Sequence, residues 1–426
     1  MAVRPGDTID LAIDRPVAGG RMLARAEGRV VLVSGAIPGE TVRARVTRAD
    51  RHVAMAQTIE VLAPSADRRA AGADPDCGGL LFSHIDYARQ LSLKGEIVQD
   101  AFRRLARHPL EQPPAVRGAT DSGYRLRARL HVRDGRVGFF REGTHQICDA
   151  AMTRQLLPES HQAVDAVVAR LGARLGDVEH IVVAENIRAS ERVLHLVPRE
   201  GVRIDPAALP SDAVPGVTGL TIAAGPRIAV VSGTATVTDT AADLALDDVI
   251  DASAKWTRHA AAFFQGHRAL VGALVRHVVT AATGDRVVDL YAGVGLFSIA
   301  LAARGASVVA VEGDRTSGAD LTANAEPWAD RVLVARQSVE EATARRPGET
   351  PDTVVVDPPR TGASKAAIEG LIRWRAPRIV YVSCDPPTLA RDAARLFEAG
   401  YTLAGLEAFD MFPNTPHVET VAVFER

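Results

Sequence analysis

The chain has 426 residues, too many for one ordinary hydrophobic core, so two or three domains are expected. Apolar residues make up 47% and charged residues 24% of the chain, which is the composition of an ordinary globular protein. The formal net charge of −2 excludes a protein that is basic as a whole.

The apolar stretches and the cysteines both favour a cytoplasmic protein. Residues 1–10 are polar and acidic, which predicts no secretory signal. The most apolar stretch, residues 287–311, is broken by an aspartate, an arginine and three glycines, so it predicts strand, turn, helix and strand rather than a membrane span. Few cysteines argue against a framework of disulfides and suit the reducing cytosol. The cysteines are Cys77, Cys148 and Cys384.

The first sixty residues contain short strand-like runs separated by glycine and proline turns. Gly28 and Pro38-Gly39 are two of these turns. Close strands with such turns favour a small β-barrel, and Ala63-Pro64-Ser65 follows as its exit linker. The predicted strands cover residues 8–13, 29–33, 41–47 and 54–61.

A helix and an arginine-rich strand follow the barrel. Residues 85–106 have helical spacing of apolar side chains. Arg125, Arg127 and Arg129 then alternate with leucine, alanine and leucine, which predicts a strand with one apolar face and one face of guanidinium groups. Between residues 101 and 141, ten arginines stand against three acidic residues. Such a face suits a phosphate backbone, and a solvated strand face in an arginine-rich protein is the alternative.

From about Lys255 onward, strands alternate with helices, which predicts a doubly wound α/β sheet. Its apolar strands cover residues 287–291, Ser307–Val311, Thr353–Val356 and 379–383, and a last strand pair covers 403–409 and 418–424. We therefore predict an α/β protein with a barrel over residues 1–62, a mixed α+β domain over 63–254 and an α/β domain over 255–426.

A glycine turn marks a candidate cofactor site. The strand over residues 287–291 runs into Gly293 and Gly295, a helix follows, and the next strand ends in Glu312. Glycines let a ligand approach the backbone, and a carboxylate after the second strand can bind ribose hydroxyls. Both NAD and S-adenosylmethionine fit this pattern. Ser298 replaces the third glycine of the dinucleotide pattern, which favours S-adenosylmethionine. The alternative is a turn without a ligand.

Two later strands end in unusual loops. One runs into Asp357-Pro358-Pro359-Arg360, and the other into Cys384-Asp385-Pro386-Pro387. Because ligands bind outside the carboxyl ends of parallel strands, we expect Glu312, Asp357 and Cys384 to converge on one crevice. Taken alone, Cys384 could be an inert buried residue and the first loop an ordinary turn. Two such loops at neighbouring strand ends favour a functional thiol.

Taken together, the motifs of this sequence resemble those of the RNA 5-methyluridine methyltransferase family. The N-terminal barrel is similar to the TRAM-type OB-fold module that many members carry. The matching motifs occur in the family's order: Phe263-Phe264-Gln265, the turn over residues 290–295, Asp357-Pro358-Pro359-Arg360, Ser383-Cys384-Asp385-Pro386, Asp410-Met411-Phe412-Pro413 and His417-Val418-Glu419.

The resemblance implies a Rossmann-like methyltransferase domain acting on RNA, either rRNA or tRNA. It implies that Cys384 is the nucleophile and Glu419 the general base. It also implies that four residues contact S-adenosylmethionine: Gln265, Tyr291, Glu312 and Asp357.

The sequence departs from the family where many members hold a four-iron cluster. The family's loop reads Cys-x5-Cys-Gly-Gly-Cys and is completed by a later cysteine. Here the loop has Ala71, Cys77 and Leu80, and the later position falls on Thr153. One of four ligands remains, so we predict no iron–sulfur cluster.

Two departures lie near the expected cofactor. Gln265 is followed by Gly266-His267 where relatives commonly place an asparagine, and Leu296 stands where some have an asparagine. These departures leave the finer cofactor contacts open.

The chemistry explains why a thiol and a carboxylate are needed. A thiolate that adds to carbon 6 of uracil makes carbon 5 nucleophilic, and a base must then remove the proton from carbon 5. The target must be unpaired or flipped out of a helix. Three alternatives stay open: methylation of an exocyclic amine through the Asp-Pro-Pro loop, a non-catalytic RNA-binding protein, and a dehydrogenase. Without the resemblance, Glu419 would be assigned as a solvated residue at a strand start.

Overall fold

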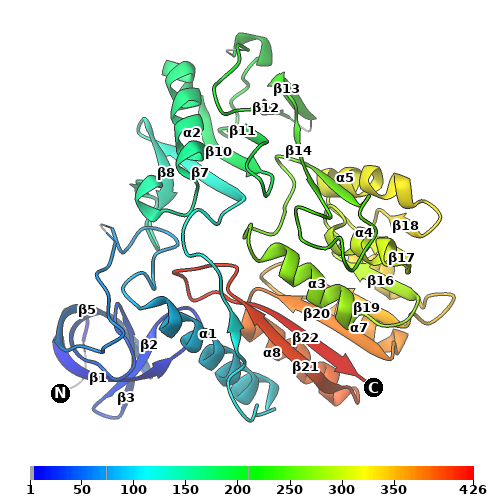
Figure 1. Ribbon diagram of the computed structural model, residues 1–426. Helices are drawn as coiled ribbons and strands as arrows, with labels where there is room; N and C mark the ends of the chain where they lie inside the picture. The colour runs from blue at the N-terminus through cyan, green and yellow to red at the C-terminus, as the bar shows by residue number, and fades with distance from the viewer. Residues whose placement is uncertain (1–3, 73, 210, 226) are drawn as a thin grey trace.

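The computed structural model describes residues 4–72, 74–209, 211–225 and 227–426. Figure 1 shows a blue N-terminal barrel, a central sheet with one long helix, and a C-terminal sheet with helices on both faces. Within the described ranges, no helix is long and apolar enough to cross a membrane. The first three residues of the segment predicted to lack a secretory signal lie outside the described residues.

The barrel is closed by five strands in the order β1-β2-β3-β5-β4. Alternate residues point inward, as the period of two along a strand requires, and Leu11, Val33 and Val42 are buried in its core. Glu40, after the Pro38-Gly39 turn, is buried and accepts hydrogen bonds from Arg68 at 2.6 and 2.7 Å. The strands are β1 (Thr8–Pro16), β2 (Met22–Ala26), β3 (Arg29–Ser34), β4 (Thr41–Ala49) and β5 (Val53–Ala63).

The central sheet has seven strands in the order β13-β12-β11-β10-β7-β8-β9. Helix α2 (Pro158–Leu171) covers one face, and Val164 and Val167 pack against Leu130 and Ile181 there. The strands are β7 (Arg127–Arg133), β8 (Arg136–Phe140), β9 (Ile147–Cys148), β10 (Val178–Glu185), β11 (Arg192–Pro198), β12 (Gly219–Ala224) and β13 (Arg227–Gly233).

The C-terminal sheet has eight strands in the order β18-β17-β16-β19-β20-β22-β21-β6. The first five in this order run parallel, and β22 is antiparallel to both β20 and β21. The strands are β6 (Val116–Arg117), β16 (Arg286–Leu290), β17 (Ser307–Val311), β18 (Val332–Ala335), β19 (Thr353–Val356), β20 (Arg378–Ser383), β21 (Thr402–Phe409) and β22 (Glu419–Glu425).

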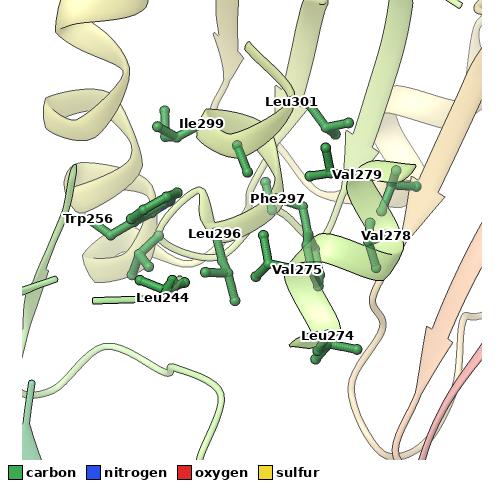
Figure 2. Close-up of a cluster of buried hydrophobic side chains, with 14 of the residues drawn as sticks. Leu244, Trp256, Leu274, Val275, Val278, Val279, Leu296, Phe297, Ile299 and Leu301 are labelled. Atoms are coloured by element: carbon green, nitrogen blue, oxygen red, sulfur yellow. The ribbon is translucent and has the colours of Figure 1, made fainter. Parts of the chain in front are cut away.

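Both faces of this sheet are buried, which explains why its strands are continuous apolar runs. Val287 points into one core and Val288 into the other. Figure 2 shows the first core, where side chains of α3 and α4 pack against one another and Trp256 lies at one side of the cluster. The helices of the first face are α3 (Val271–Ala281), α4 (Leu296–Ala303) and α5 (Arg315–Ala325), and those packed in the second core are α1 (Tyr87–Ala101), α6 (Val339–Ala344), α7 (Lys365–Trp374) and α8 (Pro386–Glu398).

The three bodies are joined through shared elements. Helix α1 runs on through a π-helical turn, Phe102–Ala106, and packs in the second core of the C-terminal sheet, whose edge strand is β6. A two-stranded ribbon of β14 (Thr236–Thr240) and β15 (Lys255–His259) leads from the central sheet to the C-terminal one. The domain boundaries at residues 62 and 254 stay a prediction.

The alternation predicted for the arginine-rich strand is confirmed, because Leu126, Ala128 and Leu130 are buried, but its arginines differ in exposure and contacts. Arg125 is half-buried and donates to the side chain of Gln155, and its guanidinium lies 5.7 Å from the centre of the Phe139 ring. Arg127 is half-buried and its Nη2 lies 3.4 Å from the carbonyl oxygen of Ala261. Of the three, Arg129 is exposed, whereas Arg125 and Arg127 are half-buried.

The sequence analysis did not predict the one disulfide that the described residues contain. Cys77 and Cys148 form a disulfide with their Cα atoms 5.7 Å apart, because the loop after Asp74 docks on β8 and β9. Cys148, which our assignment of the cluster positions passed over, is thus the residue that faces Cys77. Thr153 instead donates a hydrogen bond to the carbonyl oxygen of Ala150 at 2.7 Å. The absence of an iron–sulfur cluster stays a prediction.

Candidate active site

The ends of three parallel strands bring the predicted residues to one edge of the sheet. Strands β16, β19 and β20 lie side by side, and Asp357 and Cys384 directly follow the last two. In the antiparallel ladder of β20 and β22, Ser383 pairs with Thr420. The next step along both strands puts Cys384 beside Glu419. A thiol and a carboxyl group thus meet at the carboxyl ends of the parallel strands, the place where the sequence predicted a site.

Cys384 is a half-buried free thiol. Burial and then the negative charge of Glu419 raise its pKa to about 12, while the guanidinium of Arg360 lowers it. The thiol therefore rests protonated, and Arg360 is the group that stabilises its thiolate. Arg360 belongs to the Asp-Pro-Pro-Arg motif, but the sequence alone predicted no role for it.

Glu419 is 2% exposed, and burial raises the pKa of its carboxyl group well above the usual range. The charge of Asp357 raises that pKa further, and Arg360 lowers it. A carboxylate with a raised pKa is a stronger base than one in water, which suits it to take a proton from carbon.

The glycine turn borders open space on the cofactor side. A Cβ atom built on Gly293 meets none of the described atoms within 4 Å. Its backbone N–H donates to the carboxylate of Glu312 at 2.8 Å, so the turn and the end of β17 hold each other. Tyr291 adopts a φ of +63°, a left-handed conformation that costs free energy and often marks a ligand site. The side-chain amide of Gln265 donates to the carboxylate of Asp357 at 3.2 Å.

Sequence reasoning missed Asp289 and the role of Ser298. Asp289 is fully buried in β16, and burial raises the pKa of its carboxyl group to about 7. Its Oδ2 accepts a hydrogen bond from Ser298 at 2.5 Å, whereas its Oδ1 has no partner within the described chain. The charges of Asp357 and Glu312 act on it too. Three carboxyl groups whose charges raise the pKa of one of them favour a cation nearby.

The two positions that depart from the family pattern have other contacts. His267 is fully buried and stacks on Tyr124 with ring centroids 5.0 Å apart, and its Nε2 lies 3.2 Å from the carbonyl oxygen of Thr120. Leu296 begins α4 and packs in the first core. The backbone of the glycine turn is instead fixed by Trp256, whose Nε1 donates to the carbonyl oxygen of Gly295 at 3.2 Å.

The fold and these strand-end residues define a class I S-adenosylmethionine-dependent methyltransferase that carries an OB-type barrel at its N-terminus. A family model described as tRNA (Uracil-5-)-methyltransferase matches residues 244–426, and a TRAM domain model matches residues 2–59.

Relatives extend the match over the whole chain. A 23S rRNA (uracil(1939)-C(5))-methyltransferase of Methylococcus capsulatus is 33% identical over 446 residues, covering 99% of this chain and 98% of the relative. An uncharacterized RNA methyltransferase of Streptomyces coelicolor is 32% identical over 449 residues, covering 99% and 93%. The chain belongs to the RNA 5-methyluridine methyltransferase family, and it is an S-adenosylmethionine-dependent RNA (uracil-5-)-methyltransferase.

A solved structure has the same fold. The tRNA (uracil-54, C5)-methyltransferase of Pyrococcus abyssi, in complex with S-adenosyl-L-homocysteine, superposes with a TM-score of 0.74 at 24% identity. The match covers 97% of this chain and 99% of that one. The predicted order of barrel, central domain and methyltransferase domain is therefore confirmed as a fold.

Proposed function

We propose that the protein methylates carbon 5 of an unpaired uridine in rRNA or tRNA through a covalent bond between Cys384 and carbon 6. The observation that carries this proposal is the β20–β22 register, which brings the only free thiol of the described chain beside the buried carboxyl group of Glu419. Methylation of an exocyclic amine would need neither group.

S-adenosylmethionine supplies the methyl group when it is bound. We assign its binding to the glycine turn and to the residues around it, because their carboxyl groups suit a cation and the space beside Gly293 is open. The proposed contacts are Gln265, Tyr291, Glu312 and Asp357.

Cys384 opens the reaction as a thiolate. Its proton leaves to solvent, and the positive charge of Arg360 stabilises the anion. The sulfur then forms a bond to carbon 6 of the uracil, and the electron pair of the ring double bond moves onto carbon 5 and the adjacent carbonyl. Carbon 5 becomes a nucleophile at the position where the methyl group is accepted.

Glu419 completes the reaction. After methylation, carbon 5 still holds its original proton, and the Glu419 carboxylate removes it. The electron pair of that C–H bond restores the ring double bond, the bond from sulfur to carbon 6 breaks, and Cys384 leaves as a thiolate.

We infer that 23S rRNA is the first substrate to test, because relatives named for it match the chain from end to end at over 30% identity. The barrel is the proposed RNA-binding module, since its sequence matches the TRAM domain. Arg129 adds an exposed cation on the central sheet that suits a phosphate contact.

The test is an RNA substrate in which the target uridine carries fluorine at carbon 5. A base cannot remove fluorine as it removes a proton, so elimination stalls and the enzyme stays bonded to the RNA. We expect a denaturant-stable adduct that forms with S-adenosylmethionine, with peptide mapping to Cys384. Methylation of the unsubstituted RNA without any adduct on the fluorinated one would overturn the covalent mechanism.

A further inference from the structure

We propose that Lys94 is a positioning residue for the catalytic base, and that helix α1 holds the loop over residues 410–418 in the place that aims Glu419. The inference rests on the proposed function, because it takes Glu419 as the base that removes the proton from carbon 5. Lys94 lies outside the motifs of the methyltransferase domain, and it precedes Asp410, the first residue of this loop, by 316 positions.

The loop over residues 410–418 joins β21 to β22. Strand β21 ends at Phe409, which pairs with Glu419, the first residue of β22. Asp410 and Glu419 are thus the two ends of one loop. No hydrogen bond to the Glu419 carboxylate is found among the described residues, so its position depends on the backbone of the loop and strand and on the packing around its buried side chain.

Lys94 clamps the first end of this loop. Its side chain is fully buried, and its Nζ donates to the carboxylate of Asp410 and to the carbonyl oxygen of Phe412, the latter at 2.9 Å. A buried ammonium is costly unless acceptors surround it, and these two acceptors both belong to the loop. The buried ammonium of Lys94 therefore keeps its acceptors only while the loop stays in this position.

The choice of lysine supports a specific fit. Lysine and arginine number 50 together, yet only Lys94, Lys255 and Lys365 are lysines. Lys94 is the fully buried one, where a compact ammonium reaches one carboxylate and one carbonyl oxygen at once. Burial lowers the pKa of the Lys94 ammonium below its usual value, and the charge of Asp410 offsets part of this shift.

A second clamp from the same helix face holds the middle of the loop. Gln90, one helical turn before Lys94, exchanges hydrogen bonds with Asn414, which donates its backbone N–H at 3.0 Å and accepts through its side-chain oxygen at 2.9 Å. Arg69 also donates to that oxygen, at 2.7 Å. The barrel touches the loop as well, since a Cβ atom on Gly20 would lie 2.8 Å from Pro416.

The test follows both products of a single turnover on RNA that carries tritium at carbon 5 of the target uridine. Methyl transfer reports the steps before Glu419 acts, and tritium release reports its proton abstraction. The variant is Lys94→Met with Asp410→Asn, which removes both buried charges together and avoids leaving one unpaired. Gln90→Met loosens the second clamp without touching a buried charge, and Lys365→Met is the matched surface control.

We expect methyl transfer by the double variant to stay close to that of the wild type, while tritium release slows on the order of 10- to 100-fold, as a displacement of about 1 Å does in an active site. A methylated protein–RNA adduct should accumulate, and the KM for S-adenosylmethionine should not change. Gln90→Met should shift the same ratio by less, and Lys365→Met should leave it unchanged.

Two results would overturn the inference. If methyl transfer and tritium release fall in proportion in both clamp variants, the clamps only keep the enzyme folded. If neither activity changes, the loop does not need them. A wild-type enzyme that neither methylates the RNA nor releases tritium would instead overturn the proposed function itself.

Discussion

The buried ion cluster around Glu185 makes a strong prediction about stability. Glu185 ends β10 and is fully buried, and its carboxylate accepts from Arg192 at 2.5 Å and from Arg268 at 2.6 Å. Arg268 also donates to the carbonyl oxygen of Ile187 at 2.8 Å. Because Arg268 lies three residues after Gln265, the cluster joins the central sheet to the active-site segment.

The substitution Glu185→Gln keeps the shape of the side chain and removes its charge. Arg192 is 4% exposed and Arg268 14%, so two guanidinium groups would stay buried without a counter-ion. Breaking a buried ion pair from one side costs about 3–5 kcal/mol, which is a large part of the stability of a domain. We expect the free energy of unfolding to fall by about that amount.

The matched control is Glu349→Gln. Glu349 also accepts from an arginine, Arg286, at 2.6 Å, but the two side chains are 75% and 51% exposed. Solvent screens such a pair, so this variant should unfold like the wild type. Urea unfolding followed by circular dichroism measures both variants. Equal urea midpoints for the two variants would refute the claim that burial makes the Glu185 ion cluster important for stability.

Three further predictions concern function and cofactors. Arg129→Ala, or removal of residues 1–62, should weaken RNA binding and flatten its salt dependence, while S-adenosylmethionine affinity stays unchanged. The slope of log K against log salt concentration should fall by about 0.7 for each lost phosphate contact to single-stranded RNA, and unaltered RNA affinity in both variants would refute this footprint. Protein purified without oxygen should be colourless and free of iron, and stoichiometric iron with broad visible absorbance would show that a cluster binds. Since the pKa of Cys384 is raised to about 12, the thiolate fraction and the rate of adduct formation should rise with pH, about tenfold per unit between about pH 7 and 9, and a plateau in that range would contradict the assignment.

The sequence predicted best those elements whose pattern is local. The strands Ser307–Val311 and Thr353–Val356 agree with the structure residue for residue, because strands buried on both faces are apolar runs with clear ends. Strand β2 was missed because its five residues, with Arg25 among them, lie between two glycine turns and show no long alternation.

Long-range contacts were out of reach of the sequence pattern. Cys77 and Cys148 are 71 residues apart, and neither has a local pattern that marks the other as its partner. Lys94 lies on an amphipathic helix where a lysine suggests a solvated face, and only the packing of α1 against the C-terminal loop shows that it is buried. The role of Ser298 likewise depended on which side chain of strand β16 lies within reach of helix α4, namely Asp289.

The central claim is the division of labour between Cys384 and Glu419, and one denaturing gel with labelled RNA and labelled methyl donor tests it. Cys384→Ala should lose turnover and form no covalent adduct. Glu419→Gln should still let Cys384 attack and the methyl group transfer, so that a methylated protein–RNA adduct accumulates. Opposite outcomes separate catalysis from misfolding, which would disable both variants alike. An adduct from Cys384→Ala, or normal turnover without an adduct from Glu419→Gln, would contradict the account.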